Sequence, residues 1–264
     1  GEGLNGVKGV IYKENGKIIN NGKEDLIENM DELPFPARHL VNFEKLYLTF
    51  PGVIRGRGCK STTMITSRGC PFNCIYCGSH EIFGRKVRRR SVENVTLEIK
   101  ELIKNYGIEG IWFVDDTFTL NPKWVIKFCR KLKEEKIKIM WSCHGRVDTL
   151  SREVLKEMKS AGCIQMDFGV ESGSDKILKI LKKGTNTDLI RKAFILAKNV
   201  GIRTLATFMI NNPYETNEDL KKTFKLAKDI NADFTTFFFT TPYPGTELYD
   251  LAIDKGWFDT KKVY

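Results

Sequence analysis

The sequence predicts an α/β protein built around a parallel sheet, and two observations support this. From about residue 60 onward, short apolar runs alternate with amphipathic segments, which gives six strand-helix units in about 195 residues. Gly, Pro and Asn separate the runs at the positions where turns and helix ends are expected. Repeated units of this kind require parallel strands with helices outside the sheet. A doubly wound sheet and a barrel both satisfy the pattern, so periodicity leaves two architectures open.

Residues 1–55 are expected to form a hairpin and a linker, and residues 56–264 the main domain. The segments 7–13 and 17–20 flank Asn15-Gly16, a pair that favours the two left-handed positions of a type I′ turn. The prolines of Asp-Glu-Leu-Pro-Phe-Pro at 31–36 then exclude a central strand or a helix interior. The chain begins without an initiator Met, and we expect it to be a fragment of a longer protein.

The strands and helices of the main domain follow from apolar periodicity and from cap signals. Strands are expected at 62–66, 110–114, 137–143, 164–169, 202–210 and 233–240. Helices are expected at 91–106, from 121 onward, and at 151–161, 174–182, 187–200, 216–230 and 246–255. Ser91 suits an N-cap, Pro122 a first helical position, and Gly162 and Gly201 helix ends.

A loop after the first expected strand carries three cysteines, Cys70, Cys74 and Cys77, in a C-x3-C-x2-C spacing. Soft thiolates suit zinc or an iron–sulfur cluster. A structural zinc site needs four ligands, usually two close pairs, and the sequence has no second C-x2-C pair. Three cysteines on a four-iron cluster would leave one iron open to an outside ligand, which is a catalytic arrangement. A zinc loop and three buried thiols remain the alternatives.

Composition sets the cellular context. Seven cysteines, an odd number, indicate a reducing compartment such as the cytoplasm rather than a disulfide framework. No apolar run approaches the roughly 18 residues of a membrane span, and no signal peptide is visible. The net charge is +10, with the densest basic run at 85–90. Such charge can serve an acidic substrate or RNA, but lysines and arginines that solvate helix faces explain it more simply.

Polar residues follow the expected strands at positions that a barrel would bring to one rim. They are Asp115 and Asp116 after the second strand, Arg146 after the third, and Glu171 and Ser172 after the fourth. Carboxylates accept from ammonium or hydroxyl groups, and an arginine pairs with a carboxylate through a bidentate fork. Each also has a structural explanation, as a turn cap or a surface ion pair. His144 is placed at the same rim, where a structural role is at least as good an explanation.

Residues 67–78, Ser-Arg-Gly-Cys-Pro-Phe-Asn-Cys-Ile-Tyr-Cys-Gly, resemble the cluster motif of the radical S-adenosylmethionine (SAM) enzymes. The resemblance covers roughly residues 60–258 and implies a partial (β/α)6 barrel of the TIM type. It also implies a [4Fe-4S] cluster on the three loop cysteines, with SAM chelating the open iron. The implied SAM contacts are Asp115 or Asp116 to the ammonium, Arg146 to the carboxylate, Glu171 and Ser172 to the ribose, and Tyr76 to the adenine.

Four stretches further resemble the cobalamin-dependent branch of these enzymes, at 31–36, 113–118, 169–174 and 242–246. This implies cobalamin in a longer parent, bound by a domain that this chain lacks. It also implies methylation or another C–H functionalisation of a small or lipid-like organic substrate, driven by a low-potential donor such as ferredoxin or flavodoxin. The alternatives are a radical SAM enzyme that modifies RNA or protein, and a non-catalytic iron–sulfur or zinc protein. Nucleic acid is not expected, because no RNA-binding module is visible.

One stretch departs from the family pattern. The fifth strand usually ends in Gly-x-Pro-Gly-Glu-Thr, whereas this chain has Asn-Asn-Pro-Tyr-Glu-Thr at 211–216. Asn211 tolerates a left-handed backbone, but Tyr214 does so poorly. We therefore expect this loop to take a different path and to reshape the pocket beside it.

Overall fold

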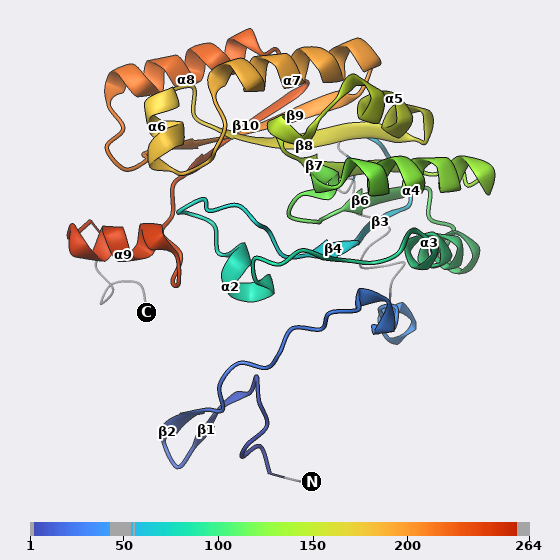
Figure 1. Cartoon of the computed structure of the whole chain (residues 1–264), viewed down its shortest axis with the longest axis horizontal. Helices are drawn as coiled ribbons and strands as arrows, with labels where there is room; N and C mark the ends of the chain where they lie inside the picture. The colour runs from blue at the N-terminus through green and yellow to red at the C-terminus, as the bar shows by residue number, and fades with distance from the viewer. Residues whose placement is uncertain (1–2, 43–53, 55, 258–264) are drawn as a thin grey trace.

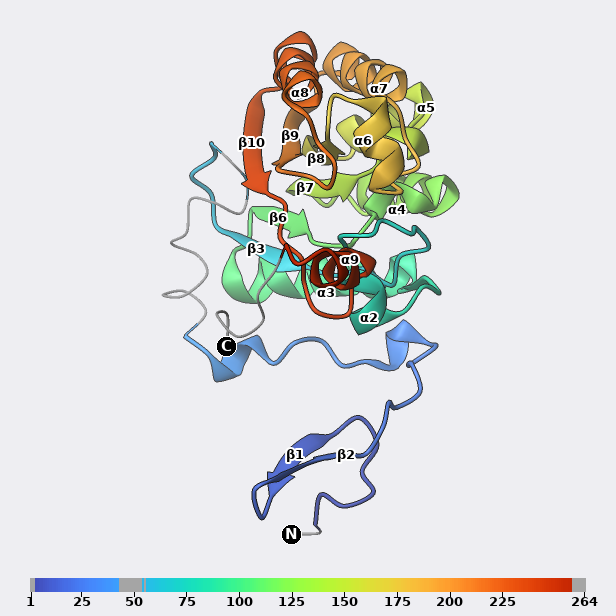
Figure 2. The same cartoon turned by 90° about the vertical axis from the view of Figure 1, so that its left-hand side faces the viewer.

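The structure is a computed structural model that describes residues 3–42, 54 and 56–257. Six parallel strands form one curved sheet in the order β10-β9-β8-β7-β6-β3. The strands are β3 (Ser61–Met64), β6 (Gly110–Phe113), β7 (Met140–Gly145), β8 (Cys163–Glu171), β9 (Arg203–Ile210) and β10 (Phe234–Phe239). Figures 1 and 2 show the sheet as an open arc with helices along its outer side. The predicted partial barrel is confirmed.

The helices follow the expected order. They are α2 (Ser79–Phe83), α3 (Val92–Tyr106), α4 (Pro122–Glu134), α5 (Arg152–Ser160), α6 (Asp175–Ile180), α7 (Thr187–Val200), α8 (Asn217–Asp229) and α9 (Glu247–Asp254). The cap signals explain the limits: the Ser91 hydroxyl accepts from the backbone N–H of Asn94, and Gly201 ends α7 with φ 75°. The short helix α2 was not predicted, because its five residues carry too little periodicity.

The main core lies between the outer face of the sheet and the helices. Phe113, Phe118, Phe128 and Trp141 are fully buried there, and Phe113 stacks on Phe118 with ring centroids 4.9 Å apart. Alternate residues of the same strands face the concave side. The pairing register aligns residues 144 and 167 across β7 and β8, so polar side chains can gather on the concave side while the outer side stays apolar.

The N-terminal segment forms the predicted hairpin. Strands β1 (Ile11–Glu14) and β2 (Lys17–Asn20) pair antiparallel. The turn residues between them, Asn15 and Gly16, have φ angles of 48° and 80°, as a type I′ turn requires. Both views show the hairpin extending away from the barrel (Figures 1 and 2).

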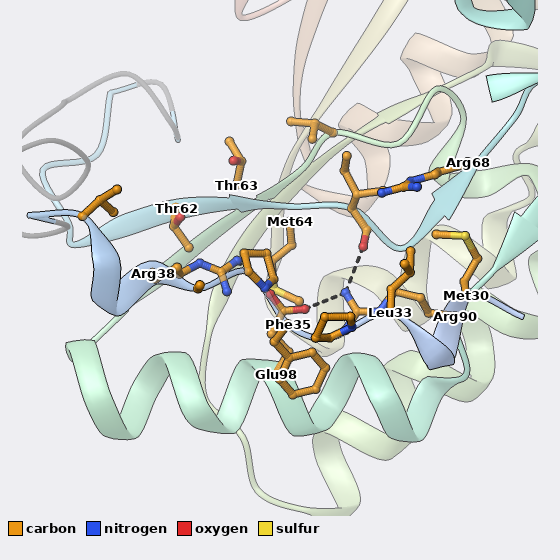
Figure 3. Close-up of a pocket in the computed structure, with 16 residues that line it drawn as sticks. Met30, Leu33, Phe35, Arg38, Thr62, Thr63, Met64, Arg68, Arg90 and Glu98 are labelled. Atoms are coloured by element: carbon orange, nitrogen blue, oxygen red, sulfur yellow. Dashed lines mark hydrogen bonds and ion pairs between the residues drawn. The ribbon is translucent and has the colours of Figure 1, made fainter. Parts of the chain in front are cut away.

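The linker after the hairpin is attached to α3 by buried polar contacts. Two short 3-10 turns, η1 (Met30–Glu32) and η2 (Arg38–Leu40), lie along it. Figure 3 shows Glu98 of α3 reaching toward the linker, where its carboxylate pairs with Arg38 at 2.7 Å and with Arg90 at 2.5 Å. Linker residues line a pocket of about 430 Å³ against β3. Among the described residues, no helix has the length and apolar character needed to cross a membrane.

Candidate functional site

The cysteine loop, residues 69–78, is held by backbone contacts at the mouth of the barrel. It follows β4 (Ser67–Arg68), which pairs with β5 (Arg88–Arg89). Gly69 has φ 97°, and a Cβ atom there would lie 2.3 Å from the carbonyl oxygen of Lys86, so only glycine fits. The N–H of Ile75 donates to the carbonyl oxygen of Leu181 at 3.1 Å. These contacts give the three cysteines a defined place.

The donor set of the loop fits an iron–sulfur cluster. All three thiols are free, with Cys74 buried and the other two partly exposed. Burial raises the pKa of Cys70 and Cys77. Among the described residues, no three His, Cys, Asp or Glu side chains converge as a single metal ion requires. A cubane places each thiolate on its own iron, so such convergence is not needed for a cluster.

The basic run after the loop is largely used inside the molecule. Arg85 donates to the carbonyl oxygen of Phe72 at 3.1 Å and also contacts the Asn73 side chain. Arg88 and Arg90 are buried and donate to backbone carbonyl groups. These arginines therefore support the cysteine loop and its neighbours, while Arg85 and Lys86 of the same run remain exposed.

The adjacent aspartates after β6 have different surroundings. Asp115 is 1% exposed and accepts from the backbone N–H of Thr66 at 3.1 Å, from its hydroxyl at 2.7 Å, and from the Ser67 hydroxyl. Asp116 is exposed and accepts from the Ser79 hydroxyl at 2.6 Å, just after the last loop cysteine. Asp115 thus fixes the chain between β3 and β4, while Asp116 faces the cysteine loop.

Glu171 forms a buried ion pair that the sequence did not predict. Its Oε1 lies 2.7 Å from the Nζ of Lys183, and the two side chains are 8% and 10% exposed. The hydroxyl of Tyr76 donates to the same oxygen at 3.0 Å and accepts from Lys183 at 3.1 Å. Burial and the charge of Glu171 raise the pKa of Tyr76, which keeps its proton for this bond. The cysteine loop and β8 therefore meet at a Tyr76–Glu171–Lys183 cluster.

The backbone around Glu171 is specialised for this contact. Glu171 itself has φ 66° and lies at an irregularity in the β8–β9 pairing. A Cβ atom on Gly169 would lie 2.3 Å from the Oε1 of Glu171 and 2.9 Å from the Nζ of Lys183. The absence of a side chain at residue 169 therefore leaves room for the ion pair. A left-handed, non-glycine residue at a bulge costs about 1–3 kcal/mol and is often found at functional sites.

Ser172 lies behind this cluster and connects β8 to α8. It is fully buried, shares a hydrogen bond of 3.1 Å with the Thr223 hydroxyl, and accepts from the backbone N–H of Ser174. A Cβ atom on Gly173 would lie 2.3 Å from the carbonyl oxygen of Lys222. The glycine therefore permits the close approach of α8 to the end of β8.

Arg146 joins the cysteine loop to the segment that carries Lys183. Its guanidinium forms a fork with Asp148 at 3.0 and 2.9 Å. It also donates to the carbonyl oxygen of Lys183 at 2.9 Å and lies 3.5 Å from the ring centroid of Phe72. The carboxylate that Arg146 binds in this structure is thus Asp148.

His144 lies on the concave side of the sheet beside the aspartates. Its ring is 5.2 Å from that of Trp112. Burial lowers the pKa of His144, while the charges of Asp167, Asp115 and Asp116 oppose that shift. The lowered pKa favours a neutral imidazole at this place.

The loop at 211–216 keeps left-handed residues despite its lack of glycine. Asn211 and Tyr214 have φ angles of 65° and 58°, so Tyr214 adopts the left-handed backbone that a tyrosine was expected to tolerate poorly. The Glu215 carboxylate accepts from the backbone N–H groups of Asn211 and Asn212 at 2.7 and 3.1 Å. This contact holds the loop in its strained conformation, so the replacement of the glycines alters the side chains that the loop presents.

Comparisons with known proteins identify related sequences. The sequence profile of the Radical SAM superfamily matches residues 64–227. An uncharacterized methyltransferase of Pyrococcus horikoshii, PH0819, is 41% identical over 253 residues, which are 96% of this chain and 53% of that protein. The anaerobic magnesium-protoporphyrin IX monomethyl ester cyclase of Rubrivivax gelatinosus is 30% identical over 254 residues, 95% of this chain and 44% of that protein. The chain thus spans about half the length of these curated relatives.

A solved structure shows the same fold. It is the cobalamin-dependent S-adenosylmethionine radical enzyme OxsB, with aqua-cobalamin and S-adenosylmethionine bound. The match has a TM-score of 0.71 at 23% identity and covers 97% of this chain and 37% of OxsB. The open arc of six parallel strands is therefore an architecture that has been seen by experiment.

Proposed function

Because this chain belongs to the radical SAM superfamily, whose cofactors are a [4Fe-4S] cluster and SAM, we propose that it cleaves SAM reductively. Cys70, Cys74 and Cys77 hold the cluster in this proposal. When bound, the cluster would supply the electron that breaks a carbon–sulfur bond of SAM, giving methionine and a 5′-deoxyadenosyl radical that would take hydrogen from an unreactive C–H group. The observation that carries the proposal is the three-cysteine loop, set beside polar groups from β6 and β8.

These polar groups have distinct roles in the proposal. Asp116, exposed beside the loop, accepts from the ammonium of SAM. The Glu171 carboxylate accepts from the ribose hydroxyls, and its ion pair with Lys183 holds it in place. Tyr76 lies against the adenosine. Arg146 positions Phe72 of the loop through its stacked contact and offers the SAM carboxylate a cation.

Two of the expected contacts are assigned positioning roles. Asp115 accepts hydrogen bonds from Thr66 and Ser67, so we assign it to the placement of the strand end before the loop. Ser172 is fully buried against α8, and we assign it to the support of the turn that presents Glu171. Neither residue needs to touch SAM for these roles.

The reaction class follows from the relatives. The names of PH0819 and of the protoporphyrin ester cyclase describe methyl transfer and ring closure, which supports methylation or another C–H functionalisation as the reaction of this chain. We propose a small or lipid-like organic substrate for this chain, a low-potential electron donor such as ferredoxin or flavodoxin, and cobalamin as a cofactor of a longer parent. A reducing cytoplasm is the proposed location.

The test is made anaerobically on protein reconstituted with iron and sulfide, with SAM and dithionite. 5′-Deoxyadenosine is measured by chromatography. Cys74→Ala is expected to abolish its formation and to lower bound iron. Cys59→Ala, which removes a free thiol outside the loop, is the matched control and is expected to keep both.

Either of two results would contradict the proposal. One is 5′-deoxyadenosine formation that persists in Cys74→Ala. The other is fully loaded wild-type protein that forms no product and whose reduced cluster shows no change in its EPR spectrum when SAM is added. A spectrum that SAM changes without turnover would support cofactor binding and place the missing requirement in the longer parent.

A further inference from the structure

A second pocket lies at the barrel mouth, across α9 from the cysteine loop. It has a volume of about 320 Å³ and is lined by residues 211–215, Thr240, Pro242, Leu248, Ala252 and Trp257. Leu248 connects the pocket to the cofactor side, because its side chain packs in a cluster with Ile75. Its backbone N–H also donates to the carbonyl oxygen of Ile75 at 2.9 Å. The pocket therefore adjoins the cysteine loop through Leu248, but none of the polar side chains around that loop lines the pocket.

Two aromatic rings form one wall of this pocket. Tyr214 and Trp257 meet edge to face, with ring centroids 5.5 Å apart and an interplanar angle of 74°. They are 52% and 51% exposed, so each ring retains a face for a ligand. Tyr214 reaches this place only through a left-handed backbone with φ 58°, a conformation that disfavours a bulky side chain. An outlier of this kind is retained where the surrounding structure and a function require it.

The chemistry of the pocket favours an uncharged, flat ligand. None of its lining residues is Lys or Arg, although the chain carries a net charge of +10. The Glu215 carboxylate is already bound by the backbone N–H groups of Asn211 and Asn212. The Asn212 side chain donates to the carbonyl oxygen of Met209 and accepts from the Thr240 hydroxyl. What remains is a rigid surface of rings and apolar side chains, which suits stacking.

We propose that Tyr214 and Trp257 form a substrate subsite that binds a flat, uncharged ring portion of the organic substrate. Calling the ligand a substrate rests on the proposed function, because the pocket adjoins the site where SAM would react. Tyr214, which stands where the family pattern has a glycine, supplies one ring of this subsite. Its left-handed backbone directs that ring toward Trp257. The subsite is separate from the SAM contacts at Tyr76 and Glu171.

The test is a fluorescence titration of the reconstituted protein with N-phenyl-1-naphthylamine, a neutral probe with three aromatic rings. Trp257→Ala and Tyr214→Asn are expected to raise the dissociation constant about tenfold or more. Asparagine accepts a left-handed backbone, so Tyr214→Asn removes the ring and keeps the turn. Phe239→Ala is the matched control: Phe239 is 73% exposed at the end of β10 but does not line the pocket, and its removal is expected to leave binding unchanged.

Three results would overturn the proposal. They are wild-type protein that does not bind the probe, ring variants that bind it as well as wild type, and displacement of the probe by S-adenosylhomocysteine, which would assign the pocket to the cofactor. Probe binding requires no SAM cleavage. Failure of the subsite is therefore distinguishable from failure of the radical reaction, which the 5′-deoxyadenosine assay decides separately.

Discussion

Replacement of Lys183 by methionine should destabilise the protein strongly, because it leaves Glu171 as a buried carboxylate without its cation. At 2.7 Å and an effective dielectric constant of about 20, the pair attracts by about 6 kcal/mol before desolvation is counted. Removing one partner of such a pair costs about 3–5 kcal/mol. The Tyr76 hydroxyl still donates to the carboxylate, so we expect the lower end of this range. For a domain of this size the melting temperature should then fall by about 6–12 °C.

Urea unfolding followed by circular dichroism measures this effect, and the neighbouring lysine supplies a control. Lys182 pairs with Glu247 at 2.6 Å, but those side chains are 51% and 57% exposed, so Lys182→Met should cost less than about 1 kcal/mol. The double variant Lys183→Met/Glu171→Gln removes both charges and should recover about 2 kcal/mol of the loss. The reasoning is refuted if the two lysine variants unfold alike, or if the double variant is no more stable than Lys183→Met.

Three further predictions follow from other contacts. Gly173→Ala should cost about 1–3 kcal/mol in urea unfolding, because the new Cβ would lie 2.3 Å from the Lys222 carbonyl oxygen; an unchanged midpoint would show that α8 shifts freely. Hydrogen bonds from Lys176 and Ser174 lower the pKa of Asp219, so the stability it gives is present above about pH 4 and is lost as the pH falls further. The advantage of wild type over Asp219→Asn should therefore shrink between pH 5 and pH 2, and a constant difference would contradict this. Glu98→Gln removes the buried anion that pairs with Arg38 and Arg90. The variant should lose about 3–5 kcal/mol of unfolding free energy, and proteolysis of the linker should be faster. Unchanged cleavage would show that other contacts hold the linker.

The order of strands and helices could be predicted because each unit carries its own local signals. Ser91, Pro122 and Gly201 mark helix limits through backbone chemistry that does not depend on the rest of the fold. The start of β7 at Met140 rather than at residue 137 could not be predicted. Its apolar run begins earlier than its pairing with β6, and only the partner strand decides where pairing starts.

The candidate site was predictable in position more than in contacts. The cysteine spacing and the rim placement of Asp116 and Glu171 follow from residue order along parallel strands. The partner of Glu171 did not follow, because Lys182 and Lys183 are adjacent and only the turn after α6 decides which one is buried. Arg146 shows the same limit: its fork to Asp148, two residues later in the chain, depends on side-chain geometry.

The described strands at the two ends of the sheet, β3 and β10, do not pair with each other. In a closed barrel, hydrogen bonds around the whole ring fix the diameter. Here no ladder joins the two described edge strands, so the distance between β3 and β10 can change without breaking hydrogen bonds between them. The two edges of the arc can therefore move apart while the strands that carry the polar groups keep their register.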